Sequence, residues 1–582
     1  MTYIRRAAVL LLAAAAPAAA QQATLASAPA TGAAASHTEA RPSFRAMART
    51  TPIVLDGALD EEAWRTAPAG DGFTQQEPHE GQPAVNRTEV RIVYDEQALY
   101  IGARMYDSEG ARGVRTQLAR RDQQSAGDYL QFVFDTFHDH TGRTILQVNP
   151  SGVRYDAGQA SASADPSWDP VWQASTRIDS LGWTAELRIP LSQLRFARSA
   201  EQTWGMQVWR YEERLNETSM WAFWGKNESG GPPRFGHVEG LRLPTRARSV
   251  ELLPYALTRA SYVAPRQAGS PFEQAHDYNA RIGGDVKALL GSNLTLDATV
   301  NPDFGQVEVD PAVVNLSAFE TYFPEKRPFF VEGSGLLGFG SFSCHFCSNV
   351  DGMSLFYSRR IGRHPQGSLP GDAEFTHMPE ASTILGAAKL TGRLAGGWQL
   401  GVLDAATRAA QGDAVIDGDV VTREVEPFTN YFVGRVKRNA RAGNLTVGGI
   451  FTSVGRRFND DVLRTRLASH AEAAGLDWRV QWKKQTYSLM GNFAMSQVSG
   501  DTAVLTRLQN APARYFQRPD RQAGSNGLFT SAFDPTLTAM RGYGGYTRLA
   551  KDQGAWQWET MVNYRSPGFE VNDLAFLTRA DY

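Results

Sequence analysis

The stretch that decides the fold is residues 294–333, LTLDATVNPDFGQVEVDPAVVNLSAFETYFPEKRPFFVEG. Its first seven residues alternate strictly, with Leu294, Leu296, Ala298 and Val300 on one face and three polar residues on the other. This period of two is typical of a β-strand with one face in water. The strand then enters a loop rich in Asn, Pro, Asp, Gly and aromatic residues. Working outward from this block, we expect similar alternating strands on both sides of it.

Three phrases in and beyond this block resemble one protein family. They are NPDFGQVE at 301–308, NLSAFETYFPEKRPFF at 315–330 and YSRRIGR at 357–363. They are similar to those of bacterial outer-membrane proteins that have an N-terminal domain like the family 9 carbohydrate-binding modules and a C-terminal β-barrel of unknown function. The resemblance covers nearly the whole chain after residue 50. It implies an architecture more directly than an activity.

Two further segments carry the resemblance into the N-terminal half. IVLDGALDEEAWRTA at 53–67 resembles the start of the family 9 domains, and WTAELRIPLSQLRF at 183–196 resembles their closing strand. Between them, Val90, Ile92 and Tyr94 alternate with Arg91 and Val93, and the closing strand alternates in a similar way. Apolar positions with this spacing suit two sheets packed face to face. We therefore expect a β-sandwich at 50–245.

The first 49 residues predict export. Arg5 and Arg6 precede the apolar run Ala8–Ala16, and the small residues Ala18 and Ala20 suit a cleavage site. Because that run is too short to span a bilayer, we interpret residues 1–20 as a secretory signal peptide. Residues 21–49 are rich in Ala, Ser and Thr without a period, which predicts a disordered linker.

Composition restricts the classes of partner and the form of any membrane insertion. The chain has 582 residues and a formal net charge of -2, which argues against a nucleic-acid partner. No apolar run of helix-spanning length follows the signal peptide. A membrane-embedded mature protein would therefore have to cross as a closed barrel.

Longer alternating strands follow residue 249. Leu476, Trp478, Val480 and Trp482 share one face, and Asp477 with its polar neighbours lies on the other; similar patterns recur at 486–496 and 556–565. Strands of about 9–11 residues with aromatic ends are typical of an outer-membrane β-barrel. A second soluble sandwich would produce the same alternation. We expect the barrel at 249–582, with the possibility of about 14 to 16 strands.

Closure at the C-terminus is a separate expectation. The final residues DLAFLTRADY at 573–582 make a poor lipid-facing strand. We expect a last strand near Phe576 that leaves the barrel incomplete, with an open sheet edge.

The strongest predicted site is the loop DPSWDPVW at 165–172. A sugar site needs flat aromatic surfaces bordered by groups that hydrogen-bond hydroxyls. Trp168 and Trp172 could supply the rings, and the polar rim could come from Asp165, Asp169, Asn149 and Arg154. The alternative is that one or both tryptophans fill the core.

The segment FDTFHDHTGR at 134–143 offers Asp135, His138, Asp139 and His140. The resemblance implies a structural calcium, for which the two carboxylates would be the preferred ligands. The alternative is a strand-end turn with exposed acids. No other cofactor is expected. We find no paired carboxylates at glycosidase spacing, so no catalytic residue is assigned.

The two cysteines, Cys344 and Cys347, lie in SFSCHFCSNVDG. In an exported protein such a pair is expected to form a small disulfide. A redox C-x-x-C site would need a thioredoxin-like context, which the sequence does not show.

The charged residues of FPEKRPFF and YSRRIGR have two interpretations. Glu325, Lys326, Arg327, Arg359, Arg360 and Arg363 could line a barrel lumen and select a solute. They could equally form an ion-pair network that fixes an inward-folded loop, which we favour.

Three function classes follow. The first is a carbohydrate-binding protein of the outer membrane, contacting lipid and glycan, that captures or takes up glycans. The second is a glycoside hydrolase or a protein associated with one. The third is a structural or assembly barrel whose sandwich binds protein. The absence of a catalytic motif favours the first over the second.

Overall fold

The computed structural model describes residues 41–581, except 124–125, 141, 160–163, 166–167, 169, 197–198, 244–249, 263, 265–268, 274, 291–292, 303–312, 317–319, 341–351, 442 and 523. The described chain is mostly β-structure. None of the helices in these residues has the length and apolar composition needed to cross a membrane.

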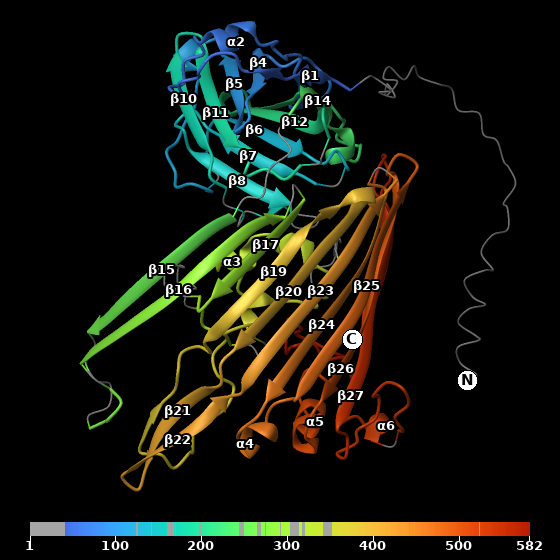
Figure 1. The fold of residues 1–582 in the computed structure, drawn as a ribbon. Coiled ribbons are helices and arrows are strands. Elements are labelled where there is room, and N and C mark those ends of the chain that lie inside the picture. The colour runs from blue at the N-terminus through green and yellow to red at the C-terminus, as the bar shows by residue number, and fades with distance from the viewer. Residues whose placement is uncertain are drawn as a thin grey trace, which may run out of the picture. The chain divides into compact units, whose positions relative to one another are not determined.

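The N-terminal part is a sandwich of two sheets (Figure 1). The first has nine strands: β1 Ser43–Arg45, β3 Thr74–Glu77, β6 Tyr129–Asp135, β7 Thr144–Val148, β8 Arg154–Gln159, β9 Ala164–Asp165, β12 Gln202–Glu212, β13 Glu217–Met220 and β14 Gly236–Leu241. The second has five, in the order β10 Gln173–Asp179, β11 Gly182–Pro190, β5 Ala98–Tyr106, β4 Thr88–Tyr94 and β2 Met47–Ala48.

One apolar core lies between the two sheets. It takes alternate residues from each strand, including Ile92, Ile101 and Leu187 from one sheet and Phe132 and Trp204 from the other. Burying one face of each sheet is what stabilises a sandwich, since the hydrophobic effect grows with the apolar area removed from water. The alternation read from the sequence is therefore the alternation of core and surface.

The folded part begins earlier than predicted. Residues 43–48, assigned to a disordered linker, form β1 and β2, which pair in parallel with β14 and β4. Phe44 explains the difference, because its ring is 4% exposed and stacks on Trp221 at 4.1 Å between centroids. A single anchored aromatic residue fixes this segment, and a composition argument cannot detect it.

The C-terminal part is an open antiparallel sheet of eleven strands that lie side by side in chain order (Figure 1). They are β15 Val250–Tyr262, β16 His276–Leu290, β17 Leu294–Val300, β19 Ile384–Leu394, β20 Trp398–Thr407, β23 Phe428–Ala440, β24 Leu445–Arg457, β25 His470–Trp482, β26 Tyr487–Ser499, β27 Ala539–Lys551 and β28 Trp558–Arg565. The edge strands β15 and β28 do not pair with each other in the described residues. A separate three-stranded sheet is made by β18 Phe375–His377, β21 Ala410–Ile416 and β22 Asp419–Glu426.

The last strand is not near Phe576, as predicted, but is β28, which ends at Arg565. Pro567 lies two residues further on, and a proline cannot donate a ladder hydrogen bond. The chain beyond it is irregular and packed: Leu574 is 3% and Ala575 0% exposed. The apolar residues that suggested a strand are core residues of a folded-back segment.

The helices are short. They are α2 Glu62–Thr66, α3 Pro328–Val331, α4 Asp461–Arg464, α5 Thr502–Gln509 and α6 Pro519–Gln522, with 3₁₀ helices at Gly110–Arg112, Glu213–Leu215, Pro232–Arg234, Ser334–Leu336, Ser358–Arg360 and Ala395–Gly397. Phe330 of α3 joins Leu337, Ile361 and Leu574 in a cluster with inward residues of β19–β27, so these segments cover one face of the large sheet.

In β17 the covered face is polar, unlike the apolar inward residues of other strands in the sheet, which reverses the interpretation of residues 294–300. In β17 the polar residues Thr295, Asp297 and Thr299 are 1%, 6% and 2% exposed, whereas Val300 is 64% exposed. The polar face of this strand is therefore the buried one.

Candidate binding site

Trp172 is a core residue. It is 1% exposed, belongs to the cluster between the two sandwich sheets, and its indole Nε1 donates to Asp156 Oδ2 at 3.0 Å. Its ring therefore offers no open face to a sugar, which corrects the assignment of Trp172 as a stacking residue. The Asp156 carboxyl, fully buried, explains why the indole N–H could be placed inside.

Trp168 differs. It is half-buried, packs against the same core, and lines a cavity of ≈ 180 Å³, which we call the Trp168 cavity. Gln193 and Arg195 line the same space. One predicted ring thus remains accessible beside polar groups.

Asn149 and Arg154, predicted as rim residues, hold the backbone. Asn149 is 4% exposed; its Oδ1 accepts the N–H groups of Ser151 and Val153 at 3.0 and 2.9 Å, and its Nδ2 donates to Gln117 O at 2.9 Å. Arg154 donates to the Trp172 carbonyl and lies over the Trp172 ring, 5.6 Å from its centroid. These contacts correct their assignment as ligand groups. Asp169, Cys344 and Cys347, with the predicted disulfide, lie outside the described residues.

The predicted calcium ligands are otherwise engaged. Asp135 is 1% exposed and accepts the His140 N–H at 2.8 Å, while Asp139 pairs with Arg393. Among the residues that the structure describes, no group of three or more His, Cys, Asp or Glu is arranged to hold a metal. Asp135 also contradicts the exposed-acid alternative, because it is buried. Its burial and the nearby Asp139 raise its pKa to about 7.

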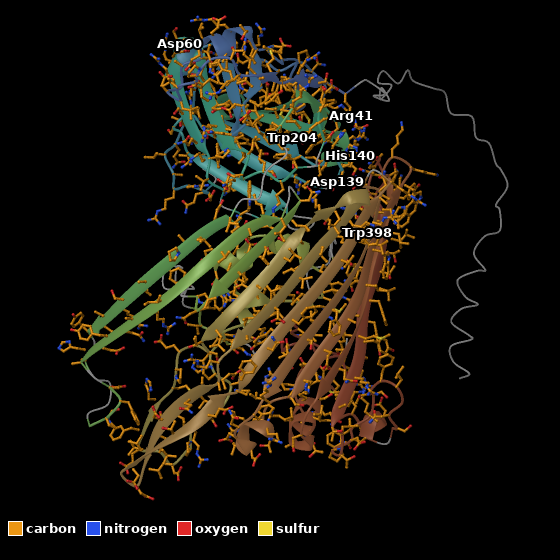
Figure 2. The ribbon with its side chains drawn as sticks, viewed as in Figure 1. Arg41, Asp60, Asp139, His140, Trp204 and Trp398 are labelled. Carbon is orange, nitrogen blue, oxygen red and sulfur yellow. The ribbon has the colours of Figure 1, made fainter. Side chains whose placement is uncertain are left out.

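Three imidazoles lie beside these acids. The His138 ring is 4.8 Å from that of His140 and 5.0 Å from that of His237, centroid to centroid. Burial and the two neighbouring histidines lower the pKa of His138 to about 4. Figure 2 shows Asp139, His140 and Arg41 together at one end of the sandwich. Burial and Arg41 lower the His140 pKa as well, so these rings are neutral at pH 7.

A second cavity, of ≈ 220 Å³, is lined by inward residues of the large sheet and by sandwich residues, among them His140 and Arg143. We call it the Lys437 cavity. Its charged lining side chains are Arg143, Arg393, Lys437, Arg479 and one acid, Asp477. Asp477 is committed to Arg435, with 2.7 Å between its Oδ2 and a guanidinium nitrogen. The lining therefore carries an excess of positive charge.

The charged residues of the family phrases form an ion-pair network in the described chain. Arg327 makes two bonds to the Glu325 carboxylate, at 2.8 and 2.7 Å, and Ser358 Oγ donates to the same carboxylate at 2.5 Å. Arg360 pairs with Glu320 at 2.9 and 2.8 Å and donates to Ala575 O at 2.9 Å. Bidentate pairs of this kind fix geometry. The network ties the 320–330 loop to the folded-back C-terminal segment.

Sequence reasoning missed Lys437, Arg479 and Gln399. Their only signal was a polar residue at alternate positions of three strands, which dozens of residues share. Their meeting depends on the strand order and register, since Gln399 lies directly opposite Lys437 in the β20–β23 pair. A single sequence does not specify that pairing.

Comparison with known proteins adds one family and a group of solved structures. The family described as "Domain of unknown function (DUF5916)" matches residues 244–582. Two structures of a carbohydrate binding module family 9 from Caldicellulosiruptor kristjanssonii, in complex with cellotriose and with glucose, are each 17% identical; each covers 35% of this chain, with 95% and 97% of their own length and TM-scores of 0.27 and 0.26. A putative carbohydrate-binding protein from Bacteroides uniformis is 11% identical over 34% of this chain and 97% of its own, with a TM-score of 0.28. No curated protein sequence matches the chain.

Proposed function

This chain belongs to the DUF5916 family, and we propose that the family-defining region is the membrane-embedded part of a bacterial outer-membrane protein whose sandwich binds carbohydrate. The observation that carries the first half is the row of exposed apolar side chains on the outer face of the eleven-stranded sheet. A soluble protein buries apolar side chains and exposes polar ones. A sheet facing lipid does the opposite.

The outward residues of the sheet are apolar and exposed. They include Leu252 at 69%, Ile282 at 78%, Leu476 at 59% and Val562 at 71%. Inward residues are a mixture of buried polar ones, for example Thr391, Thr429, Ser488 and Arg548 at 0–2%, and buried apolar ones such as Leu403 and Val433 at 0%. Exposed apolar surface repeated over many strands has no favourable place in water. A bilayer supplies the apolar contact that these side chains lack.

The strand lengths suit a bilayer. Strands β23 to β27 each have 13 residues. At about 3.3 Å per residue such a strand is roughly 43 Å long, and a tilt of about 45° reduces its rise to roughly 30 Å, the thickness of the hydrocarbon core. Trp398, Trp482 and Trp558 lie at strand ends, where interfacial aromatic residues are expected.

The connections between strands suggest which side the sandwich is on. At one end of the sheet the connections are short, at 291–293, 395–397, 441–444, 483–486 and 552–557. At the other end they are longer, at 263–275, 301–383, 408–427, 458–469 and 500–538. In outer-membrane proteins the short turns face the periplasm. Since β15 starts at the short-turn end, we assign the preceding sandwich to the periplasm.

Membrane fractionation combined with a protease-protection assay tests the proposed outer-membrane location and the proposed side of the sandwich. The mature protein is expected in the outer-membrane fraction, and the sandwich is expected to resist protease added to intact cells but not to cells with a permeabilised outer membrane. Recovery of the protein in the soluble periplasmic fraction would remove the membrane assignment. Cleavage of the sandwich in intact cells would reverse only the sidedness.

Carbohydrate binding by the sandwich is supported by the resemblance of 53–67 and 183–196 to family 9 domains and by Trp168. That ring is accessible beside Gln193 and Arg195, an aromatic surface with neighbouring donors, as sugar recognition requires. We assign Trp168 as the ring that stacks on the sugar. Glucose and cellotriose are the first ligands to try.

The test is calorimetric titration of the full chain in detergent with those two sugars. Trp168→Ala should abolish binding and leave the melting temperature nearly unchanged. Gln97→Ala, on the exposed turn between β4 and β5, is a control that should bind as wild type. Wild-type affinity in Trp168→Ala would exclude this ring and leave the sandwich without an assigned ligand group.

A further inference from the structure

The Lys437 cavity contains two cations that make no direct ion pair with the described residues. Lys437 in β23 and Arg479 in β25 both line it. Neither forms a hydrogen bond or an ion pair within 4 Å with the side chains of the described residues, and the Arg479 Nε is buried without a partner. By contrast, Arg435 on the same face pairs with Asp477 at 2.7 Å. Both side chains are half-buried, and cations withdrawn from water are normally paired, because removing a charge from water is costly.

Gln399 is a third unsatisfied group in the same space. It is 6% exposed, it lines the cavity, and within the described chain its amide has no hydrogen-bond partner. It lies directly opposite Lys437 in the β20–β23 pair, so their Cα atoms are about 5 Å apart. Buried side-chain amides are rarely left without partners. Its position beside the unpaired ammonium indicates a shared ligand.

The geometry brings the three groups toward one point. Lys437 pairs in register with Gly448, which in turn pairs with Asp477, two residues before Arg479. Gly448 carries no side chain, and a Cβ there would lie 2.6 Å from the Arg435 guanidinium and 2.7 Å from Asp477 Oδ1. Because strands are about 4.8 Å apart, the bases of the Lys437 and Arg479 side chains are on the order of 10 Å apart laterally. Two long side chains can reach the same anion across this distance.

The remaining lining supports the same sign of charge. Arg143 adds positive charge, Arg393 is already paired with Asp139, and the lining acid, Asp477, is already bonded to Arg435. The volume of ≈ 220 Å³ corresponds to roughly seven water molecules at about 30 Å³ each. The space therefore suits a small anionic group with part of its carrier.

We propose that the Lys437 cavity is a binding site for a small anion, a carboxylate, phosphate or sulfate group, held by Lys437 and Arg479 and oriented by the Gln399 amide. The site adjoins the Trp168 cavity, with which it shares Arg143, Leu336 and Arg393, and it does not rest on carbohydrate binding. Cationic donors and a neutral amide donor together complement the oxygens of such a group. In a polar lumen, a site of this kind selects for anionic solutes.

The experiment measures binding to the full-length protein in detergent at constant ionic strength. The probes are inorganic phosphate, inorganic sulfate and D-glucuronate, with glucose as the uncharged counterpart of glucuronate. Wild type should bind at least one anion saturably and should not bind glucose at this site. Free inorganic anions and a sugar acid are distinguished by which of the three probes binds most tightly.

Lys437→Met and Arg479→Met should each weaken binding about 10- to 100-fold, the range of one charge-assisted hydrogen bond. Arg438→Met is the matched control. Arg438 is the next residue in β23, is exposed on the opposite face, and lies over the Trp398 ring at 5.3 Å. Its loss should leave anion binding unchanged.

Stability separates the proposal from a structural role. Without anion, Lys437→Met should melt at or above the wild-type temperature, because an uncompensated buried charge is removed. Added anion should raise the melting temperature of wild type but not of the variant. The proposal is overturned by an absence of saturable binding of all three anions, by equal loss in Arg438→Met, or by a lower melting temperature of Lys437→Met with unchanged anion binding.

Discussion

The sandwich and the eleven-stranded sheet are built from the same period-two pattern, but the sheet also leaves many apolar residues exposed on its outer face. In the sandwich, the alternate apolar residues of β11, such as Trp183 and Leu187, are 0–1% exposed. In the sheet, outward apolar residues such as Leu476 are exposed, and Asp477 beside it is 8% exposed. A period of two therefore shows only that a strand has one apolar and one polar face. The surroundings of the strand decide which face is buried.

The largest expected effect is in the sandwich core. Trp172→Ala should lower the free energy of unfolding by about 3–5 kcal/mol, because a fully buried indole is lost with its bond to Asp156. Thermal unfolding followed by tryptophan fluorescence measures it. Trp398→Ala is the control from the sheet: this ring is 42% exposed, and its loss in detergent should have little effect. An unchanged melting temperature in Trp172→Ala would restore Trp172 as a candidate ligand residue.

Placing one charge on the outer surface of the sandwich and one on the outer surface of the eleven-stranded sheet tests the difference between them more directly. Phe451 in β24 and Ile178 in β10 are 45% and 40% exposed, so they are matched in exposure. Phe451→Arg should destabilise the bilayer-inserted protein by about 2–4 kcal/mol if this position lies near the membrane midplane. Ile178→Arg should change stability by less than about 0.5 kcal/mol.

The measurement is urea unfolding in lipid vesicles for the first variant and in the same vesicles for the second. Equal, small effects in both variants would mean that the exposed apolar face of the sheet is not in lipid. Such a result would leave the exposed apolar residues on the outer face of the sheet without an explanation.

The features that could be predicted from the sequence are those that depend only on neighbouring residues, and the features that could not depend on contacts between distant segments. The strands, a sandwich in the N-terminal half and the longer strands after 249 follow from local alternation, which needs only neighbours in sequence, although the sandwich begins at Ser43 and not at residue 50. The burial of Trp172, the anchor at Phe44 and the pairing of Gln399 with Lys437 depend on contacts between distant segments. A single sequence carries no record of those contacts.

A smaller effect comes from a buried acid pair in the sandwich. Glu212 and Glu217 are directly opposite on β12 and β13 and are 3% and 1% exposed. Burial, against the opposing effect of Arg210, raises the pKa of Glu212 to about 7. The folded state therefore holds a proton more tightly than the unfolded state, whose carboxyl has a pKa of 4.5.

The direction of the pH dependence of stability follows from the difference between the folded-state and unfolded-state pKa of Glu212. A raised folded-state pKa contributes stability that is fully present below about pH 4.5 and is lost as the pH rises through about 7. Glu212→Gln mimics the protonated carboxyl, so it should flatten this slope, with a difference on the order of 1 kcal/mol between pH 5 and pH 7.5. Melting temperatures across that range measure it, and an unchanged slope in the variant would show that Glu212 stays ionised throughout.

The smallest expected effect is at the exposed ion pair of Arg242 and Glu201, which are 3.3 Å apart with side chains 73% and 53% exposed. In water the attraction is weak, and holding two long side chains together costs entropy. Glu201→Gln should therefore lower the free energy of unfolding by less than about 1 kcal/mol, and the difference should shrink in high salt.

On the inner face of the sheet, Arg456 pairs with Asp573 at 2.6 Å with side chains 0% and 17% exposed. Salt cannot screen that pair in the same way, because solvent does not reach the guanidinium. Melting temperatures of Glu201→Gln and Asp573→Asn at low and high salt measure the contrast, and a comparable salt dependence in both would mean that the inner face of the sheet is open to water.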